Sequence, residues 1–390
     1  MPSSLGGFEF LSPTKFILGF GAAAGLADEV KALGATKVLV VTKKTMVERG
    51  DVAPVLQSLQ AAQIPFVIYD GVLPDAPIDL VADAIELLRS SDCDLVVGCG
   101  GGSAMDIAKC VAVAATNGTD LRSMVGHDKV ARPGLPLIVL ATTHVAGADT
   151  GSAAVMQIDE KTHEHGAINS PFMLADVVIN DPLLTMSMPP EATADTGVDT
   201  LVTGIECLTG TQANPVSDLF SESILEICSR YLPVVVADGS DREARYHMAL
   251  AASMAGWAYM SSFIGAVHGI ATGVAAVCEL THGRSMAAIL PAVMRFNLPA
   301  NPGAFRRIAE IFAQQVSGMT DLEAARLSIV AVEQLLDSIG VAHRLRDCGL
   351  RREDTPTVVE LSWSQIDDFL ASNARAFGRQ DVADILEDAF

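Results

Sequence analysis

The segment from residue 98 to residue 109 contains a glycine run whose chemistry suits a phosphate group. It reads Gly-Cys-Gly-Gly-Gly-Ser-Ala-Met-Asp-Ile-Ala-Lys and follows a short apolar run. Gly100, Gly101 and Gly102 allow backbone N–H groups to approach an anion closely, and the N-terminus of a following helix adds partial positive charge. Ser103 lies where an N-cap oxygen or a phosphate donor is expected. The spacing differs from both the two-glycine dinucleotide fingerprint and the Walker A loop.

Three charged side chains near this segment are candidates for contacts with a nucleotide. Asp106 and Lys109 lie three positions apart on the predicted helix, so they contact either a ribose or phosphate group or only each other. Lys43 follows the apolar run Lys37–Val41, and a dinucleotide fold binds the adenosine ribose near the end of such a strand. Its ammonium group either pairs with a 2′-phosphate or is a solvated strand end. The sequence leaves these alternatives open.

The elements that must position these residues follow from the hydrophobic pattern. Four apolar runs are predicted strands: Lys37–Val41, Pro65–Tyr69, Asp94–Val97 and Pro136–Leu140. Helical stretches such as Pro54–Ala62 and Leu80–Arg89 alternate with them, which predicts a parallel sheet covered on both faces. Long helical patterns follow: Glu191–Gly210, Val216–Val236, Asp241–Tyr259, Gly265–Glu279, Pro302–Val316 and Asp321–Ser338. We expect an α/β dinucleotide-binding domain over residues 1–181, an all-α domain over residues 182–390, and an active site in the cleft between them.

The composition narrows the class of protein. The chain has 390 residues, half of them hydrophobic, which is enough for two domains. A formal net charge of -21 argues against a nucleic-acid partner, because phosphate backbones need clustered Lys and Arg. The seven cysteines form no CxxC pair and are expected to be free thiols in a reducing cytoplasm. Neither a signal peptide nor an apolar run of about 20 residues is evident, so no membrane partner is expected.

The glycine segment, with Ser103, Asp106 and Lys109 at fixed offsets, resembles the GGGSxxDxAK signature of the iron-containing (group III) alcohol dehydrogenases. Further motifs recur in the order of that family along nearly the whole chain: Ala141-Thr142-Thr143, Asp181-Pro182, Pro189-Pro190, Thr196-Gly197-Val198-Asp199, Ile205-Glu206, Asn214-Pro215, His268-Gly269, His282-Gly283, Leu290-Pro291 and Phe296-Asn297. The resemblance implies the two-domain architecture shared with dehydroquinate synthase, an NAD or NADP cofactor, and homo-oligomers. It also implies that the glycine loop and Asp106 bind the cofactor and that Thr142 and Thr143 line it.

The resemblance also implies a metal site with one altered ligand. The family binds Fe²⁺ or Zn²⁺ through an aspartate, a histidine four residues later, and two histidines fourteen residues apart. Asp199, His268 and His282 match three of these ligands. Thr203 stands in place of the second ligand, and a hydroxyl is a poor substitute for an imidazole nitrogen. Thr272 replaces a histidine that relays protons near the nicotinamide in the family.

Further histidines and departures from the family pattern accompany this site. His163 and His165 lie in a polar turn, which favours a surface hairpin over a metal site. His144 adjoins the two threonines and is a candidate for the pocket. Phe263 stands where the family has a glycine, shortly before His268.

The sequence therefore predicts an NAD(P)-dependent oxidoreductase that moves a hydride between nicotinamide C4 and the carbon of a small alcohol, aldehyde or ketone. Asp199, His268 and His282 either hold a metal, or one of the histidines acts as a general acid without metal. The alternatives are a metal-independent reductase resembling maleylacetate reductase, a lyase resembling dehydroquinate synthase, and a non-catalytic paralogue.

Overall fold

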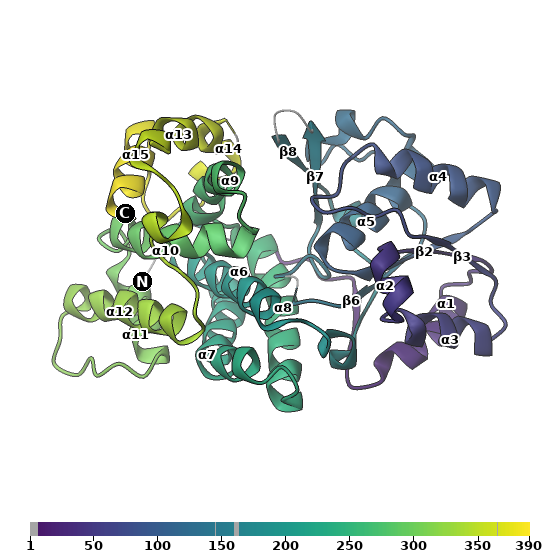
Figure 1. The fold of residues 1–390 in the computed structure, drawn as a ribbon, viewed down its shortest axis with the longest axis horizontal. Coiled ribbons are helices and arrows are strands. Elements are labelled where there is room, and N and C mark those ends of the chain that lie inside the picture. Colours follow the sequence, from purple (N-terminus) through teal and green to yellow (C-terminus); the bar gives the residue numbers. More distant parts are fainter. Residues whose placement is uncertain (1–6, 145, 160–163, 365) are drawn as a thin grey trace. The chain divides into compact units, whose positions relative to one another are not determined.

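The computed structural model describes residues 7–390 apart from residues 145, 160–163 and 365. The chain forms two compact units (Figure 1). One comprises residues 12–187. The other comprises residues 188–390 together with the N-terminal segment up to Leu11. Each unit is described on its own below.

The first unit is built on a six-stranded parallel sheet. Its strands, in spatial order, are β1 (Lys15–Leu18), β9 (Val177–Asn180), β6 (Leu137–Ala141), β4 (Leu95–Gly100), β2 (Val38–Val41) and β3 (Phe66–Tyr69). The central strands β2, β4 and β6 are buried at every position, which explains their continuous apolar sequence.

Helices cover both faces of this sheet, and β2 shows how. Leu39 and Val41 belong to the core that contains α4 (Leu80–Ser90) and α5 (Gly102–Asn117), whereas Val38 and Val40 belong to the core that contains α1 (Leu26–Ala32) and α3 (Ala53–Ala61). Figure 1 shows these helix pairs on opposite sides of the strands. The unit also contains α2 (Lys44–Arg49) and the short turns η1 (Ala22–Gly25), η2 (Leu121–Met124), η3 (Pro171–Met173) and η4 (Pro182–Thr185).

A smaller sheet contains His165, one of the two histidines that the sequence places in a polar turn. Its strands are β5 (Gly126–His127), β8 (Glu164–Asn169) and β7 (Ala153–Asp159), and β7 pairs with β8 in antiparallel fashion. His165 lies on β8 opposite Gln157, which agrees with the predicted hairpin. His163 lies outside the described residues.

The second unit is helical throughout the residues that the structure describes. Its helices are α6 (Pro190–Thr209), α7 (Pro215–Ala237), α8 (Arg242–Ser262), α9 (Ala266–Cys278), α10 (His282–Asn297), α11 (Pro302–Ile311), α12 (Asp321–Ser338), α13 (Thr355–Trp363), α14 (Asp367–Leu370) and α15 (Arg379–Asp388), with turns η5 (Leu345–Cys348) and η6 (Arg352–Asp354). Asn214 and Thr320 start α7 and α12 with capping boxes, so both boundaries follow from local sequence.

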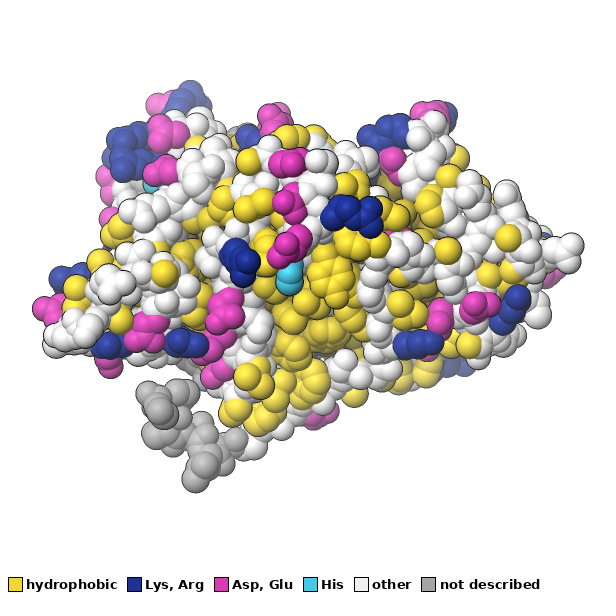
Figure 2. Space-filling model, turned by 90° about the horizontal axis from the view of Figure 1, so that it is seen from below, with side chains coloured by type: hydrophobic (Ala, Val, Ile, Leu, Met, Phe, Trp, Pro, Cys, Tyr) yellow, Lys and Arg dark blue, Asp and Glu magenta, His cyan; other side chains and the backbone are white. Residues whose placement is uncertain are grey.

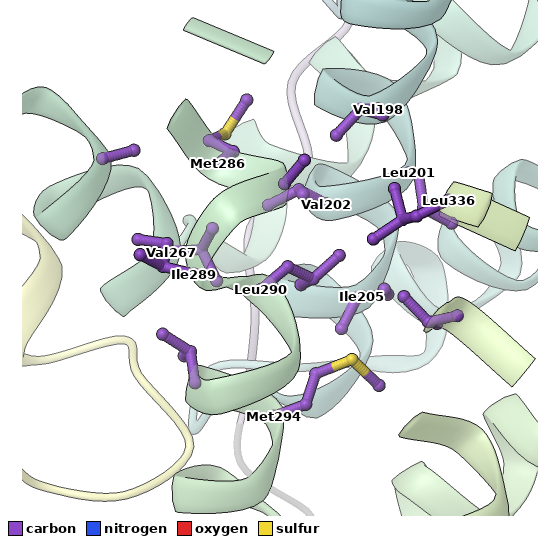
Figure 3. Close-up of a cluster of buried hydrophobic side chains, with 14 of the residues drawn as sticks. Val198, Leu201, Val202, Ile205, Val267, Met286, Ile289, Leu290, Met294 and Leu336 are labelled. Atoms are coloured by element: carbon purple, nitrogen blue, oxygen red, sulfur yellow. The ribbon is translucent and has the colours of Figure 1, made fainter. Parts of the chain in front are cut away.

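Helix α6 is the centre of the second unit. Most of its side chains are buried, and it packs mainly against α7, α8 and α10. Figure 3 shows part of the core around it, with Val198, Leu201, Val202 and Ile205 from α6, Val267 from α9, Met286, Ile289, Leu290 and Met294 from α10, and Leu336 from α12. A helix fixed on several sides is a rigid support for functional side chains.

The structure confirms the predicted fold class, a parallel-sheet α/β unit followed by a helical one. The four predicted strands and nine predicted helices, α5 included, are present, with the largest shift at the end of α11, which stops at Ile311 and not at Val316. The edge strand β1, its neighbour β9 and the helices α1, α2, α10, α13, α14 and α15 were not predicted. Strand β1 is short, and α10 contains Pro291, which weakens its helical pattern.

Three further features concern helix composition, cysteines and surface charge. Among the described residues, no single helix has the length and apolar composition of a membrane span. All seven cysteines are free thiols, five of them buried. Figure 2 shows Lys and Arg side chains dispersed over the face it presents, mostly close to acidic ones.

Candidate functional site

The glycine loop joins β4 to α5 in the first unit. Gly100 ends the strand, Gly101 is the N-cap of the helix with an extended backbone, and Gly102 is the first helical residue. The N-cap position predicted for Ser103 is therefore wrong, because the N-cap is Gly101, two residues earlier, and Ser103 lies within the first turn of the helix. The alternative role of Ser103, a phosphate donor, stays a prediction. The first N–H groups of a helix have no carbonyl partner inside it, so this turn can still bind an anion.

The glycines of this loop serve two purposes. A Cβ on Gly98 would lie 2.7 Å from the Cβ of Ala108, and one on Gly100 would lie 2.6 Å from the Cβ of Ala104. These two glycines allow α5 to pack directly on β4. A Cβ on Gly102 would meet nothing within 4 Å, so the space in front of the helix N-terminus is open. The loop thus fits a phosphate group at Gly102.

Thr142 and Thr143, which the resemblance places along the cofactor, lie beside the glycine loop. They follow β6, the neighbour of β4, and the backbone N–H of Thr142 donates to the carbonyl of Gly100 at 2.9 Å. The hydroxyl oxygen of Thr143 would lie 3.2 Å from a Cβ on Gly101. The carboxyl ends of two adjacent parallel strands therefore bring these residues to one edge of the sheet.

Asp106 and Lys109 face away from that edge, toward β7. Lys109 is fully buried, and its ammonium group donates to the carbonyls of Gly151 at 2.7 Å and Ala153 at 2.9 Å. Burial raises the pKa of Asp106 to about 7, although Lys109 and the backbone N–H of Val155 oppose this shift. These contacts join Lys109 to the start of β7 and the residues before it, and Asp106 to Val155 within β7.

Lys43 lies just beyond the carboxyl end of β2, where the sequence placed it. It is half-buried and is the N-cap residue of α2. Burial lowers the pKa of its ammonium group, and the nearby carboxylate of Asp75 opposes this shift. The cation that would meet a 2′-phosphate therefore already has a negative neighbour.

The second unit brings together three predicted metal ligands. One ligand atom each from Asp199, His268 and His282 lies within 4.8 Å of the others. Asp199 comes from α6, His268 from the first turn of α9, and His282 is the first residue of α10. The imidazole rings are 5.6 Å apart, and Nε2 of His268 lies 3.7 Å from the Asp199 carboxylate. A carboxylate and two imidazoles are donors that Fe²⁺ and Zn²⁺ accept, so this set fits a divalent metal.

His268 is held from behind by a second carboxylate. Its Nδ1 lies 2.6 Å from Oε2 of Glu206, which is also on α6. Burial by itself lowers the pKa of His268. The negative charge of Glu206 and the contacts with Asp199 and Glu206 outweigh burial and raise that pKa to about 9.

His282 is placed by close packing of α10 on α6. A Cβ on Gly283 would lie 1.9 Å from the carbonyl oxygen of Asp195, so only glycine permits this approach. The carboxylate of Asp195 accepts hydrogen bonds from the Thr281 hydroxyl at 2.8 Å and from Nε of Arg284 at 2.9 Å. These contacts fix the start of α10 one helical turn from Asp199. His282 itself is exposed.

Thr203 and Thr272 direct their hydroxyl groups to their own helices. Thr203 is buried and donates to the carbonyl of Asp199 at 3.0 Å, and Thr272 donates to the carbonyl of Gly269 at 2.9 Å. The candidate metal set among the described residues therefore has three members.

Sequence reasoning assigned no role to Asp195 or Glu206. The signal was present in the spacing, because offsets of four and seven residues place Asp195, Asp199 and Glu206 on one face of a helix. Phe263, where the family has a glycine, adopts φ 58° and ψ 169°, a region that is favourable for glycine alone. His144 is fully buried in the first unit.

Comparison with known families matches both units. The profile described as "Iron-containing alcohol dehydrogenase" covers residues 13–182, and the one described as "Fe-containing alcohol dehydrogenase family, C-terminal" covers residues 193–390. These matches confirm the resemblance that the motifs indicate.

Individual relatives match over nearly their whole length. The 1,3-propanediol dehydrogenase of Citrobacter freundii is 34% identical over 385 residues, which is 98% of this chain and 99% of that protein. The NAD-dependent methanol dehydrogenase of Bacillus methanolicus is 31% identical over 381 residues, again 98% and 99%. The crystal structure of a 1,3-propanediol oxidoreductase superposes with a TM-score of 0.95 at 34% identity, covering 99% of this chain and 100% of that one.

Proposed function

Because the chain belongs to the iron-containing alcohol dehydrogenase family, we propose that it oxidises small primary alcohols, or reduces the corresponding aldehydes, with a metal held by Asp199, His268 and His282. The family confirms the predicted class of enzyme, an alcohol dehydrogenase or aldehyde reductase. One observation carries the metal-assisted mechanism: three ligand atoms from three helices converge within 4.8 Å.

We propose the following division of work between the residues. The first-turn N–H groups at Gly102 and Ser103 bind the pyrophosphate, and Thr142 and Thr143 orient the nicotinamide. Asp199, His268 and His282 bind the metal, which, when present, polarises the oxygen of the substrate. A bound nicotinamide would accept at C4 the hydride that the carbinol carbon gives up in alcohol oxidation, and the hydroxyl proton would leave toward solvent near the exposed His282. Thr203 and Thr272 are smaller than imidazole and widen the site.

The proposed cofactor is NAD, with NADP as a competitor. NAD is supported by the methanol dehydrogenase relative, which is named as NAD-dependent. Asp75 beside Lys43 supports the same preference, since its negative charge would repel a 2′-phosphate. Titration of the purified protein with NADH and NADPH, followed by nicotinamide fluorescence, tests this preference. Tighter binding of NADPH would contradict it.

A metal-free reductase is the second candidate, and one observation favours it. His268 is held between two carboxylates, which keep its imidazole protonated at neutral pH and thus able to donate a proton. Both candidates are tested by following NADH formation with ethanol, 1-propanol and 1,3-propanediol, using protein that was exhaustively dialysed against EDTA. The metal-assisted mechanism predicts no turnover after dialysis.

We also propose a cellular location, a set of excluded partners and an oligomeric state for the enzyme. Seven free cysteines support a reducing cytoplasm, and the net charge of -21 supports the expectation that neither nucleic acid nor a membrane is a partner. We propose a homo-oligomer on the strength of the family resemblance. Light scattering of the purified protein measures its mass and tests the last point.

A further inference from the structure

Glu206 is a buried carboxylate that the proposed reaction does not use. It is 5% exposed and accepts three hydrogen bonds from the start of α9. The backbone N–H of Val267 donates to Oε1 at 2.6 Å, and the backbone N–H of Gly265 donates to Oε2 at 2.9 Å. The third contact is the one from Nδ1 of His268 to Oε2, at 2.6 Å.

The glycine at position 265 leaves room for the carboxylate of Glu206. A Cβ on Gly265 would lie 3.1 Å from Oε1 of Glu206 and 2.9 Å from the amide oxygen of Asn373. Asn373 in turn accepts the backbone N–H of Ala266. The first N–H groups of α9, which no helix carbonyl can satisfy, are thus bound by side chains from other elements.

These contacts determine which ring nitrogen of His268 has a lone pair that can bind a metal ion. A carboxylate offers only acceptors, so Nδ1 must carry a proton to bond to it. In a singly protonated ring, Nε2 then has the free lone pair, and it is the nitrogen that lies 3.7 Å from Asp199. We propose that Glu206 is a positioning residue that fixes the Nδ1–H tautomer of His268 and directs its Nε2 to the metal shared with Asp199 and His282. This inference rests on the proposed metal site.

Asp195 provides a matched comparison on the same helix. It is also a buried carboxylate that binds the start of a histidine-bearing helix, but its partners are Thr281 and Arg284 and not an imidazole. Loss of either carboxylate removes hydrogen bonds that secure a helix. Only Glu206, however, determines a tautomer.

The isosteric change Glu206→Gln separates these effects. If its amide nitrogen faces Nδ1, it donates to the ring, and the ring proton moves to Nε2, where it blocks the metal. If the amide nitrogen takes the other position, it opposes the N–H of Val267 and disturbs the start of α9. Both orientations weaken metal binding, and an outer carboxylate of this kind typically contributes about 10- to 100-fold in affinity.

The first measurement uses the unchanged protein loaded with Zn²⁺ and labelled with ¹⁵N-histidine. Ring ¹⁵N shifts should show His268 protonated at Nδ1 and metal-bound at Nε2. A proton on Nε2 would overturn the inference without any variant, so the result stands even if E206Q fails to fold.

The second measurement compares Zn²⁺ dissociation constants of the unchanged protein, E206Q and Asp195→Asn, by competition with a chelating dye. We expect about 10- to 100-fold weaker binding in E206Q, a smaller loss in D195N, and unchanged His268 shifts in D195N. If the unchanged protein binds Zn²⁺ and E206Q binds it equally well, the role of Glu206 is refuted while the metal site stands. If the unchanged protein binds no Zn²⁺, the proposed metal site falls and the inference falls with it.

Discussion

The glycine loop of the first unit lies at a helix N-terminus, and so do two of the three metal-cluster residues of the second unit, His268 and His282, but the two sites use these helix ends differently. At α5, the position in front of Gly102 is open, so the N–H groups of the first turn are left for a ligand. At α9, the N–H groups of Gly265 and Val267 are already bound by Glu206. Backbone groups form the proposed phosphate site. In the proposed metal site, the helix ends only position the side chains that would bind the metal.

This difference explains why the two sites diverge differently from the family pattern. A backbone site needs glycines at fixed positions, and the GGGSxxDxAK signature is complete. A side-chain site keeps its framework when one ligand changes, because Asp195 and Glu206 hold α10 and α9 in place independently of Thr203. The substitution at Thr203 therefore alters the donor set without disturbing the helices.

The sharpest test of the backbone site is Gly102→Ala. Nothing lies within 4 Å of the added Cβ, so the fold should be retained while the methyl group fills the space proposed for the phosphate. We expect NADH affinity to fall by about tenfold or more, which corresponds to about 1.4 kcal/mol. Isothermal titration calorimetry measures this change.

Gly303→Ala is the matched control, since Gly303 also lies in the first turn of a helix with nothing within 4 Å of its Cβ position. It should leave NADH binding unchanged. Equal nucleotide affinity in G102A and G303A would show that the phosphate does not bind at the N-terminus of α5.

The substitution Thr203→His tests the metal-ligand assignment, because it places an imidazole one helical turn from Asp199. A fourth ligand should increase Zn²⁺ affinity, by about tenfold if the ring reaches the ion. Thr272→His is the comparison, because it adds an imidazole to α9 without completing the expected ligand set. Competition with a chelating dye should show tighter binding in T203H and not in T272H; the reverse order would contradict the assignment of Asp199, His268 and His282.

A substitution at Asp106 tests whether this residue of the glycine-loop signature contributes to the stability of the fold. Its pKa in the folded protein is about 7, above the value of about 3.9 for an unfolded chain. The folded state therefore binds the proton more tightly, and the stability this contributes is full below about pH 3.9 and is lost as pH rises through 7. Relative to Asp106→Asn, the unchanged protein should lose urea resistance between about pH 4 and pH 7. A difference that is constant or grows with pH would show that Asp106 is not buried as described.

The smallest expected effect concerns the turn before α9. Phe263 adopts φ 58° and ψ 169°, and its side chain is 37% exposed, so Phe263→Gly should relieve backbone strain at little cost in packing. We expect a gain in stability of about 1 kcal/mol, read as a higher Tm. Glu279→Gly is the control: Glu279 has φ 52° and ψ 39°, an αL geometry that other residues tolerate, so its gain should be smaller. A lower Tm for F263G would show that the Phe263 ring contributes more than the strain costs.

The sequence was most informative where chemistry depends on neighbours along the chain. The glycine loop, the apolar strands and the capped helices follow local rules, so their positions were predicted well. Ser103 was misplaced by two helix positions, because any residue in a run of small residues can serve as the N-cap and local sequence does not single one out.

Long-range contacts were not accessible in this way. The sequence left open whether Lys109 contacts a phosphate or only Asp106, and in the structure it donates to carbonyls more than 40 residues away. The roles of Asp195 and Glu206 depend on contacts to Arg284 and His268 across the helical unit, and no local pattern reveals such partners. Family motifs located the ligands, whereas only the packing of α6, α9 and α10 shows what holds them.

Metal removal and restoration tests the central claim most directly. Alcohol-dependent NADH formation would be measured with EDTA-dialysed protein before and after anaerobic addition of stoichiometric Fe²⁺ or Zn²⁺, with NADH binding recorded in parallel. The structure predicts that dialysis abolishes turnover but not NADH binding, and that one equivalent of metal restores turnover in the unchanged protein and not in Asp199→Asn. Full turnover after metal removal would contradict the three-ligand metal site.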